Sequence, residues 1–342
     1  MSFMPTAWNK TTGIQARRVA DFKDLSHEEW VEKRKDGIGG SDISAIAGVN
    51  HFKSAIDVYL EKKGKKVTQE NEKMKWGKLL EDPVAQEYSQ SIGVQVNRVN
   101  AILQHPEIPH FQANIDRLIV RNGHDLSSSD PVHQNLLNNG NGILEVKTTG
   151  WAKAWANNSI PDMYYCQLQW YLYITGLKWG HFAVLVSGQD FLTTDLVPYD
   201  PKVGKNLAFI ADRFWQENIV KDVIPDVDHN PANYESVKLL FPNVDAKTVN
   251  LPEDLNDLIA KRILLNKNIG FANDQKKVID AKVLRALESN KYGFTSKYKV
   301  TRVLKSHMSL SKSAIKEKYP KIYAECSSAS ESVYPLYSEI KS

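Results

Sequence analysis

The spacing of hydrophobic side chains changes repeatedly along the first 235 residues, from helical to strand-like and back. Ser26–Glu29 is a capping-box pattern and predicts the start of a helix. Further helical patterns occupy residues 54–63, 76–88, 161–175 and 206–218. Segments rich in β-branched and apolar side chains predict strands at residues 111–120, 143–149, 181–186 and 191–197.

This order of elements predicts an α/β fold for residues 1–235, with a central mixed β-sheet flanked by helices. The pattern changes from Pro231 onward. Two helical stretches follow, at residues 251–266 and 274–289, and then a strand at residues 297–305 that is basic on one face. We therefore predict a mostly helical C-terminal extension, residues 236–342, and leave its role open.

The composition, 42% hydrophobic and 25% charged, is that of a soluble globular protein. The sequence has neither the run of about eighteen apolar residues of a membrane helix nor the apolar core of a signal peptide. Cys166 and Cys326 lack the spacing of metal ligands, so we expect a protein of the reducing cytoplasm that does not enter a membrane. The formal net charge of +4 permits a polyanionic partner without requiring one.

Two predicted strands carry charged side chains that suggest chemistry. Because side chains alternate along a strand, Glu145 and Lys147 project from one face and Val146 from the other. Asp116 lies in the middle of the predicted strand 111–120, where an unpaired acid is costly. If the two strands pair, both carboxylates would meet beside the amine and could hold a divalent cation. An exposed edge strand with a cross-strand ion pair is the alternative.

A glycine-rich turn at residues 36–42 precedes a helical pattern and would offer backbone N–H groups to an anion. Arg34 lies just before it and shares a helix face with Trp30, so the turn would form a phosphate pocket. The alternative is an ordinary turn in which Ser41 or Asp42 caps the helix.

Polar side chains on two other helices have two interpretations each. Glu81 lies beside an apolar stripe, either as a surface acid or as an acid that points into a site. Gln167 and Gln169 belong to a helix that is apolar on nearly every side, so each buried amide needs a partner. That partner is either a ligand or the protein itself.

Five motifs follow one another in the chain: Arg34 with Gly37–Asp42, Trp76–Glu81, Ala113–Asp116, Leu144–Lys147 and Tyr165–Gln169. In this order they resemble the YqaJ-like viral recombinase family, which is related to phage lambda exonuclease and belongs to the PD-(D/E)XK nuclease superfamily. The resemblance covers about residues 26–230 and, more loosely, residues 298–332. Ile115 replaces the proline that names the superfamily, but that proline is a turn residue and not a ligand.

The resemblance implies a role for each residue of the charged cluster. Asp116, Glu145 and the backbone carbonyl of Val146 would bind one or two Mg²⁺ or Mn²⁺ ions. Lys147 would orient the attacking water and offset the charge of the transition state. Glu81 would support the metal or the water.

The glycine-rich turn also gains a role from the resemblance. Arg34, Ser41, Asn114 and Gln167 would line a pocket for a 5′-terminal phosphate, with Trp30 packed beside it. Together these roles imply a metal-dependent 5′-to-3′ exonuclease that digests linear double-stranded DNA and leaves 3′ overhangs.

Such an enzyme would serve phage-type homologous recombination with a single-strand annealing protein, in the host cytoplasm if phage-encoded. Relatives form rings, often trimers, so a homo-oligomeric ring is expected. Two other functions remain open: a structure- or site-specific endonuclease of the same superfamily, and a non-catalytic DNA-binding protein that kept the fold. The phosphate pocket favours the exonuclease over the endonuclease.

Overall fold

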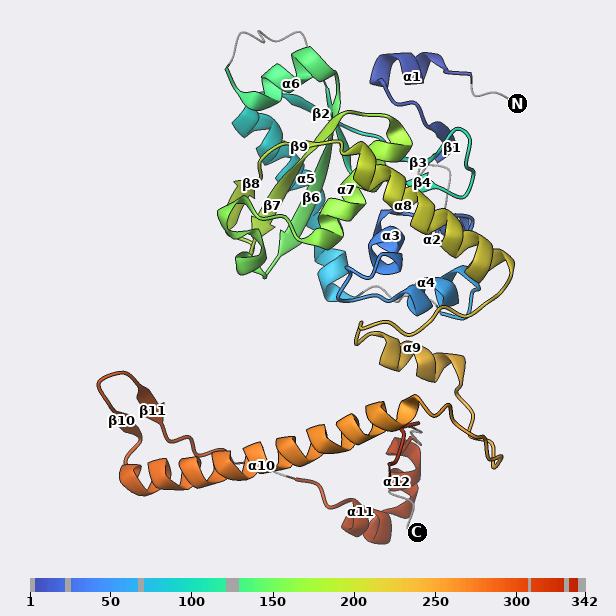
Figure 1. The fold of residues 1–342 in the computed structure, drawn as a ribbon. Coiled ribbons are helices and arrows are strands. Elements are labelled where there is room, and N and C mark those ends of the chain that lie inside the picture. Colours follow the sequence, from blue (N-terminus) through green and yellow to red (C-terminus); the bar gives the residue numbers. More distant parts are fainter. Residues whose placement is uncertain are drawn as a thin grey trace. The chain divides into compact units, whose positions relative to one another are not determined.

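The computed structural model places the predicted strand 143–149 inside a six-stranded sheet (Figure 1). The strands are β2 (Gln95–Arg98), β5 (Arg117–Val120), β6 (Gly142–Thr149), β7 (Trp179–Val186), β8 (Asp190–Thr193) and β9 (Val197–Pro198). Their order is β2-β5-β6-β7-β8, and β9 pairs with β7. Because β6 and β7 are parallel and the other pairs antiparallel, the predicted central mixed sheet is confirmed.

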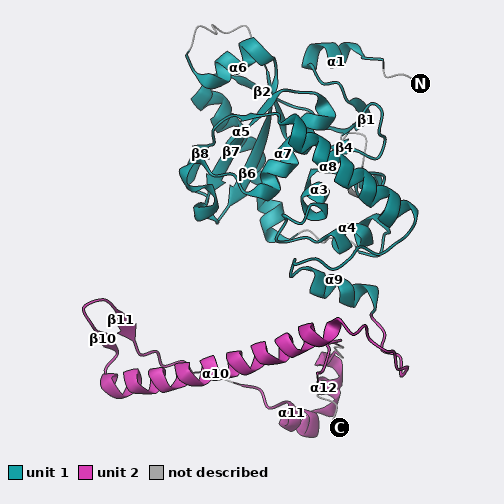
Figure 2. Ribbon diagram, in the orientation of Figure 1, with its two compact units in different colours: residues 1–241 teal, residues 242–342 magenta. Residues whose placement is uncertain are grey.

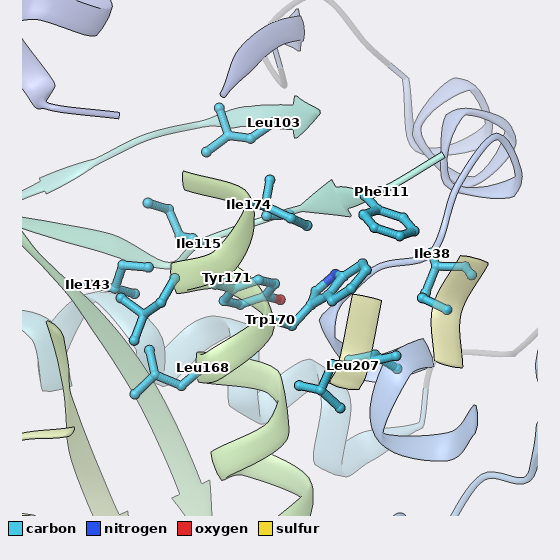
Figure 3. Close-up of a cluster of buried hydrophobic side chains, with 14 of the residues drawn as sticks. Ile38, Leu103, Phe111, Ile115, Ile143, Leu168, Trp170, Tyr171, Ile174 and Leu207 are labelled. Carbon is cyan, nitrogen blue, oxygen red and sulfur yellow. The ribbon is translucent and has the colours of Figure 1, made fainter. Parts of the chain in front are cut away.

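Helices cover both faces of this sheet. One face carries α5 (Glu72–Ile92) and α6 (Pro131–Asn139); the other carries α3 (Gly40–Ile46), α7 (Asp162–Thr175) and α8 (Pro201–Phe214). Figure 3 shows the apolar cluster on the second face, around Trp170 and Tyr171 of α7. Along β6, Ile143 joins the α7 cluster and Leu144 joins the α5 cluster. The alternation therefore directs Glu145 and Lys147 toward α7.

The structure describes residues 4–21, 26–66, 71–120, 129–306, 309–328 and 332–337. The chain divides into two compact units, residues 1–241 and 242–342 (Figure 2). The sequence-based boundary between residues 235 and 236 falls within α9 (Asn233–Leu240), which contacts α4 (Ala55–Lys62) of the first unit. The functional division of the chain at this point stays a prediction.

The predicted strand 111–120 is broken into two strands of different sheets. β4 (Gln112–Ala113) belongs to a small sheet with β1 (Arg17–Asp21) and β3 (Ala101–Gln104), whereas β5 belongs to the central sheet. Asp116 therefore lies between the two strands, directly before β5, and its placement in the middle of one strand was wrong. At this break the chain leaves one sheet and enters the other.

The helices of the first unit also differ in part from the sequence pattern. The capping box of Ser26 and Glu29 is confirmed at the start of α2 (His27–Lys35). Asn71 caps α5 earlier than expected, so Pro83 lies well inside that helix and not in its first turn. A helix that the sequence pattern did not predict, α6, lies between β5 and β6; Asp130 caps it and Pro131 begins it.

The remaining helical segments of the first unit are short. They are α1 (Ala7–Thr12), a 3₁₀ segment (Ala152–Asn158) and a π-helical turn (Trp215–Val220) that extends α8. Among all the helices that the structure describes, in both units, none is both long and apolar enough to cross a membrane.

The second unit is built on one long helix, α10 (Leu255–Leu287), where the sequence pattern predicted two helices. A hairpin of β10 (Tyr292–Phe294) and β11 (Lys299–Thr301) follows, so the predicted strand 297–305 is shorter than expected. Two further helices, α11 (Lys312–Lys318) and α12 (Pro320–Cys326), make the extension mostly helical, as predicted.

Candidate active site

A fully buried acid lies at the centre of the site. Glu145 of β6 has no exposed surface, and its Oε2 accepts a hydrogen bond from the Lys147 ammonium at 2.7 Å. Lys147 also lies 5.2 Å from the centre of the Tyr164 ring on α7. The two charged side chains thus share the strand face that the alternation predicts, and this face is buried against a helix.

Asp116 joins them because β5 and β6 are antiparallel neighbours. Arg117 pairs with Leu144, so Asp116, directly before β5, comes opposite the residue that follows Leu144 on β6, which is Glu145. The Asp116 Oδ2 atom accepts the backbone N–H of Val146 at 2.9 Å. The structure therefore brings Asp116, Glu145 and Lys147 together, although Asp116 was expected within a strand.

The charges in this cluster perturb one another. Burial, followed by the neighbouring Asp116 carboxylate, raises the pKa of Glu145 to about 8, against the opposing pull of Lys147. Burial alone would lower the pKa of Lys147, but the charges of Glu145 and Asp116 outweigh it and raise that pKa. Two carboxylates at this depth favour a bound cation.

The residues fit a divalent cation that keeps part of its water shell. Glu145 Oε1 is buried and has no hydrogen-bond partner among the described residues. Mg²⁺ is usually held by one or two carboxylates together with waters. In the described ranges no group of three His, Cys, Asp or Glu side chains converges, so protein carboxylates would supply only part of the coordination.

Glu81 approaches the cluster from α5 but is held by another residue. Its carboxylate forms an ion pair with Arg117, which also pairs with Asp82. Burial and then the Asp116 charge raise the pKa of Glu81, and Arg117 opposes them. Its predicted role at the metal stays a prediction. No role for Arg117 was predicted from the sequence. The two adjacent acids, Glu81 and Asp82, could have indicated that a basic partner lies near them.

The five residues expected around a terminal phosphate line one pocket of 170 Å³. Trp30 and Arg34 come from α2, Ser41 from α3, Asn114 from the break between β4 and β5, and Gln167 from α7. The pocket is completed by Gly39, Gly40, Asp42, Gln112 and Tyr171.

Polar groups inside the pocket are suited to an anion. The Arg34 guanidinium lies 4.9 Å from the centre of the Trp30 ring and donates to Ser41 Oγ at 3.1 Å. Gln167 Nε2 donates to the Tyr171 hydroxyl at 3.0 Å. The Asn114 Oδ1 atom, an acceptor, is buried without a hydrogen-bond partner in the described part of the chain, so only the Nδ2 end of this amide could donate to an anion. An arginine, a hydroxyl and two amides thus surround the cavity.

Gln169 has a structural role. Its amide donates to the backbone oxygen of Pro198 at 2.9 Å and accepts the N–H of Asp200 at 2.8 Å. These bonds tie α7 to the segment that leads into α8. For Gln169 the alternative of a partner within the protein is therefore correct.

Comparison with known proteins finds a family match over this part of the chain. Residues 29–178, which include every candidate site residue, match the YqaJ-like viral recombinase domain. This segment is therefore similar to a YqaJ-like viral recombinase domain. The chain is 29% identical over 322 residues to the uncharacterized protein YqaJ of Bacillus subtilis (strain 168), covering 91% of this chain and 94% of that protein.

Solved structures of exonucleases show more distant similarity. The alkaline exonuclease LHK-Exo of Laribacter hongkongensis is 17% identical with a TM-score of 0.44, over 63% of this chain and all of that one. A phage-related exonuclease of Haemophilus somnus is 13% identical with a TM-score of 0.36, over 55% of this chain and 96% of that one.

A buried network of charges in the YqaJ-like domain lies behind the pocket and was not predicted. Asp42, a fully buried acid, accepts hydrogen bonds from Lys53 and Lys62 at 2.7 Å each and from the backbone N–H of Gly39 at 3.1 Å. Its carboxylate also lies 4.0 Å from the Arg34 guanidinium. Asp42 thus fixes the start of α3 and holds three cations near the pocket.

A glycine lets α3 of the YqaJ-like domain approach α7. A Cβ atom on Gly40 would lie 2.6 Å from the Tyr171 ring and 2.7 Å from Gln167 Cγ. A Cβ atom on the neighbouring Gly39 would come no closer than 3.7 Å to any atom outside its immediate surroundings. Of the three glycines in the motif, Gly39 alone has room for a side chain, since a Cβ atom on Gly37 would also come within 2.8 Å of the His110 backbone oxygen.

The pocket and the carboxylates of the YqaJ-like domain share a wall. Tyr171 lines the pocket, and its pKa is raised by burial and then by the charges of Glu145 and Asp116. An anion in the pocket would therefore lie close to the acidic cluster.

Proposed function

We propose that the chain is a metal-dependent 5′-to-3′ exonuclease that degrades linear double-stranded DNA and leaves 3′ single-stranded ends. The observation that carries this proposal is the pairing of the half-buried Asp116 with the fully buried Glu145, which has an unpartnered oxygen and the amine of Lys147 bound beside it. The YqaJ-like domain over residues 29–178 supports the assignment.

The chemistry is phosphodiester hydrolysis, in which negative charge develops at the scissile phosphate. When bound, Mg²⁺ or Mn²⁺ would act as a Lewis acid at that phosphate and lower the pKa of the attacking water. Asp116, Glu145 and the carbonyl of Val146 would hold the cation. The Lys147 ammonium, fixed by Glu145, would orient the water and offset charge in the transition state. Glu81 would act as an auxiliary acid of the same site.

The pocket supports cleavage from an end rather than within a duplex. A phosphate in the interior of a duplex is flanked by sugars on both sides, whereas a terminal phosphate can enter an enclosed cavity. Arg34 would supply the positive charge, and Ser41, Asn114 and Gln167 would supply polar contacts, with Trp30 at the edge. A nuclease that cuts internal sites has no use for this convergence.

Two further parts of the proposal rest on the resemblance. The 3′ single strand would be passed to a single-strand annealing protein in phage-type recombination, in the cytoplasm of the host. A homo-oligomeric ring, such as a trimer, would enclose the duplex and keep the enzyme on it between cuts.

One experiment tests the function directly. End-labelled linear duplex and closed circular duplex are incubated with the full chain and Mg²⁺. We expect the linear DNA to disappear, faster with 5′-phosphate than with 5′-hydroxyl ends, and the circle to persist. Lys147→Ala should abolish digestion while leaving DNA binding largely intact. Cleavage of the circle at a similar rate, or full activity of Lys147→Ala, would contradict the proposal.

A further inference from the structure

The hairpin of the second unit is a small, well-defined ribbon. Tyr292 pairs with Thr301 and Phe294 pairs with Lys299 across the two strands. At the turn, the Thr295 hydroxyl accepts the N–H of Tyr298 at 3.0 Å, and Thr295 N–H donates to the Tyr298 carbonyl at 2.9 Å. The turn is therefore held by its own hydrogen bonds, although the ribbon has only two strands.

One face of the ribbon packs on the long helix. Gly293 lies against Leu287, the buried residue at the end of α10, since a Cβ atom on the glycine would come within 2.5 Å of that leucine. The side chains that alternate with Gly293, those of Tyr292 and Phe294, must therefore lie on the opposite face. This packing fixes which face of the hairpin is turned outward.

The outward face carries aromatic rings and an amine in contact. The Lys299 ammonium lies 4.8 Å from the centre of the Tyr292 ring and 5.8 Å from that of Phe294. The side chains remain open to solvent, with Tyr292 at 49%, Phe294 at 72% and Tyr298 at 71% exposure. This exposure leaves the rings available to stack on a ligand.

The charge of the hairpin segment is strongly positive. Residues 289–305 contain five basic residues, namely Lys291, Lys297, Lys299, Arg302 and Lys305, and no acidic residue. This local charge of +5 exceeds the +4 of the whole chain, so the rest of the sequence is slightly acidic. The basic excess of the protein is thus concentrated on one ribbon.

We propose that this hairpin binds single-stranded DNA. Lysines that follow a backbone of phosphates, combined with exposed rings on which unpaired bases stack, are the physical basis of single-strand binding. The phosphates of a duplex would pair with the lysines, but its bases could not stack on the exposed rings, because they are already stacked on one another. An acidic peptide likewise would use the lysines and leave the rings exposed.

The surface lies outside the nuclease unit, and its binding does not depend on the proposed hydrolysis. If the enzyme resects duplex ends, the strand that it leaves intact is a ligand of the required kind. A circular single strand in the absence of metal cannot be digested from an end, so its binding tests the hairpin alone. The binding result would therefore stand even if the nuclease proposal failed.

The experiment measures the affinity of the full chain for a labelled circular oligothymidylate, in EDTA, by fluorescence anisotropy. One variant, Phe294→Ala with Tyr298→Ala, removes the rings, and another, Lys297→Ala with Lys299→Ala, removes charge. The control, Phe271→Ala with Lys282→Ala, removes an exposed ring and a lysine from α10 of the same unit.

We expect about tenfold weaker binding for the ring variant, since each stacked base contributes that much or more. The lysine variant should lower the slope of log affinity against log salt by about 0.7 for each phosphate that the removed amines neutralised. The control should bind like the wild-type protein. Ring and lysine variants that bind like the control would overturn the proposal.

Three other readouts guard against misinterpretation. With wild-type protein, a 5-iodouracil-substituted strand should crosslink within residues 289–305, which requires no variant to fold; crosslinks confined elsewhere would refute the surface. Equal losses by the ring variant on duplex and single strand would refute single-strand recognition. If the ring variant sedimented as a smaller assembly than the wild-type protein but kept its DNA affinity, the face would instead be a contact between copies of the chain.

Discussion

Replacing Asp42 with asparagine tests whether one buried carboxylate holds the cations behind the pocket. The Asp42 side chain is 1% exposed and bonds the ammonium groups of Lys53 and Lys62 at 2.7 Å each. Asparagine has nearly the same shape and keeps an oxygen for the N–H of Gly39, which Asp42 accepts at 3.1 Å. The substitution therefore removes the charge with little change in packing.

The size of the effect follows from what the lysines retain. Lys53 keeps the carboxylate of Glu61 at 2.5 Å, but Lys62, only 4% exposed, keeps only a neutral partner there, the backbone oxygen of Arg34 at 2.6 Å. Removing one partner of a buried ion pair costs about 3–5 kcal/mol. In a unit of this size, 1 kcal/mol corresponds to a change of about 2–4 °C in Tm. We expect a Tm lower by about 10 °C.

The effect of Asp42→Asn should also depend on pH. Burial disfavours the charged form of Asp42, but Lys53, Lys62 and Arg34 outweigh burial and hold its pKa well below the ordinary value of 3.8. An acid with a lowered pKa contributes stability above its unfolded value and loses it as the pH falls toward the folded value. The difference in stability between the wild-type protein and the variant should be full at neutral pH and shrink below pH 3.8.

Thermal unfolding followed by circular dichroism, at neutral and acid pH, measures both effects. The matched control is Glu235→Gln, which breaks an ion pair of 2.9 Å with Lys238 in which the acid is 70% exposed. Exposed pairs contribute at most about 1 kcal/mol, so this variant should unfold close to the wild-type temperature. If Asp42→Asn unfolded no earlier than Glu235→Gln, the network would not stabilise the unit.

Two further substitutions test the pocket and the metal site. Gly40→Ala should destabilise the protein by about 1–3 kcal/mol through overpacking, and it should remove the preference for 5′-phosphorylated ends. The control Gly39→Ala should do neither, because position 39 has room for a Cβ atom. Glu145→Gln should weaken Mn²⁺ binding at least tenfold in calorimetry, because it removes one of the two carboxylates. Glu235→Gln is its control, and unchanged Mn²⁺ binding by Glu145→Gln would place the metal elsewhere.

Local periodicity was enough to predict the shared face of Glu145 and Lys147. Alternation along a strand is a property of the backbone and needs no knowledge of the partners. The break before Asp116 was not predictable in this way, because alternation along residues 111–120 does not reveal that β4 and β5 join different sheets. The acid still reached its expected neighbours, since the register of β5 and β6 decides that contact.

The pocket was predictable in part for a similar reason. Trp30 and Arg34 are four residues apart on a helix, and their contact follows from helical geometry. The charges behind the pocket come from residues 11 and 20 positions away from Asp42, so their meeting depends on how α3 and α4 pack. No local pattern marks Lys53 or Lys62 as partners of that acid.

In the second unit, the sequence around Gly270 suggested a gap between two helices. The structure continues as one helix, and a Cβ atom on Gly270 would meet nothing within 4 Å. Glycine weakens a helix by roughly 1 kcal/mol relative to alanine without ending it, and no proline lies between residues 255 and 287. The expected gap between residues 266 and 274 is therefore continuous helix.

Helix α7 couples the two halves of the candidate site. Tyr164 lies against the Lys147 ammonium, Gln167 faces the pocket, and Tyr171 separates the pocket from the carboxylates. A helix that shifted along its axis would move all three together, so the distance between a bound terminal phosphate and the acidic cluster is set by one rigid element. A change on α2, such as one at Arg34, would instead weaken the grip on the phosphate and leave the carboxylates in place. Loss of end preference without loss of cleavage is therefore expected from a change at Arg34 on α2, whereas a shift of the whole of α7 should affect both.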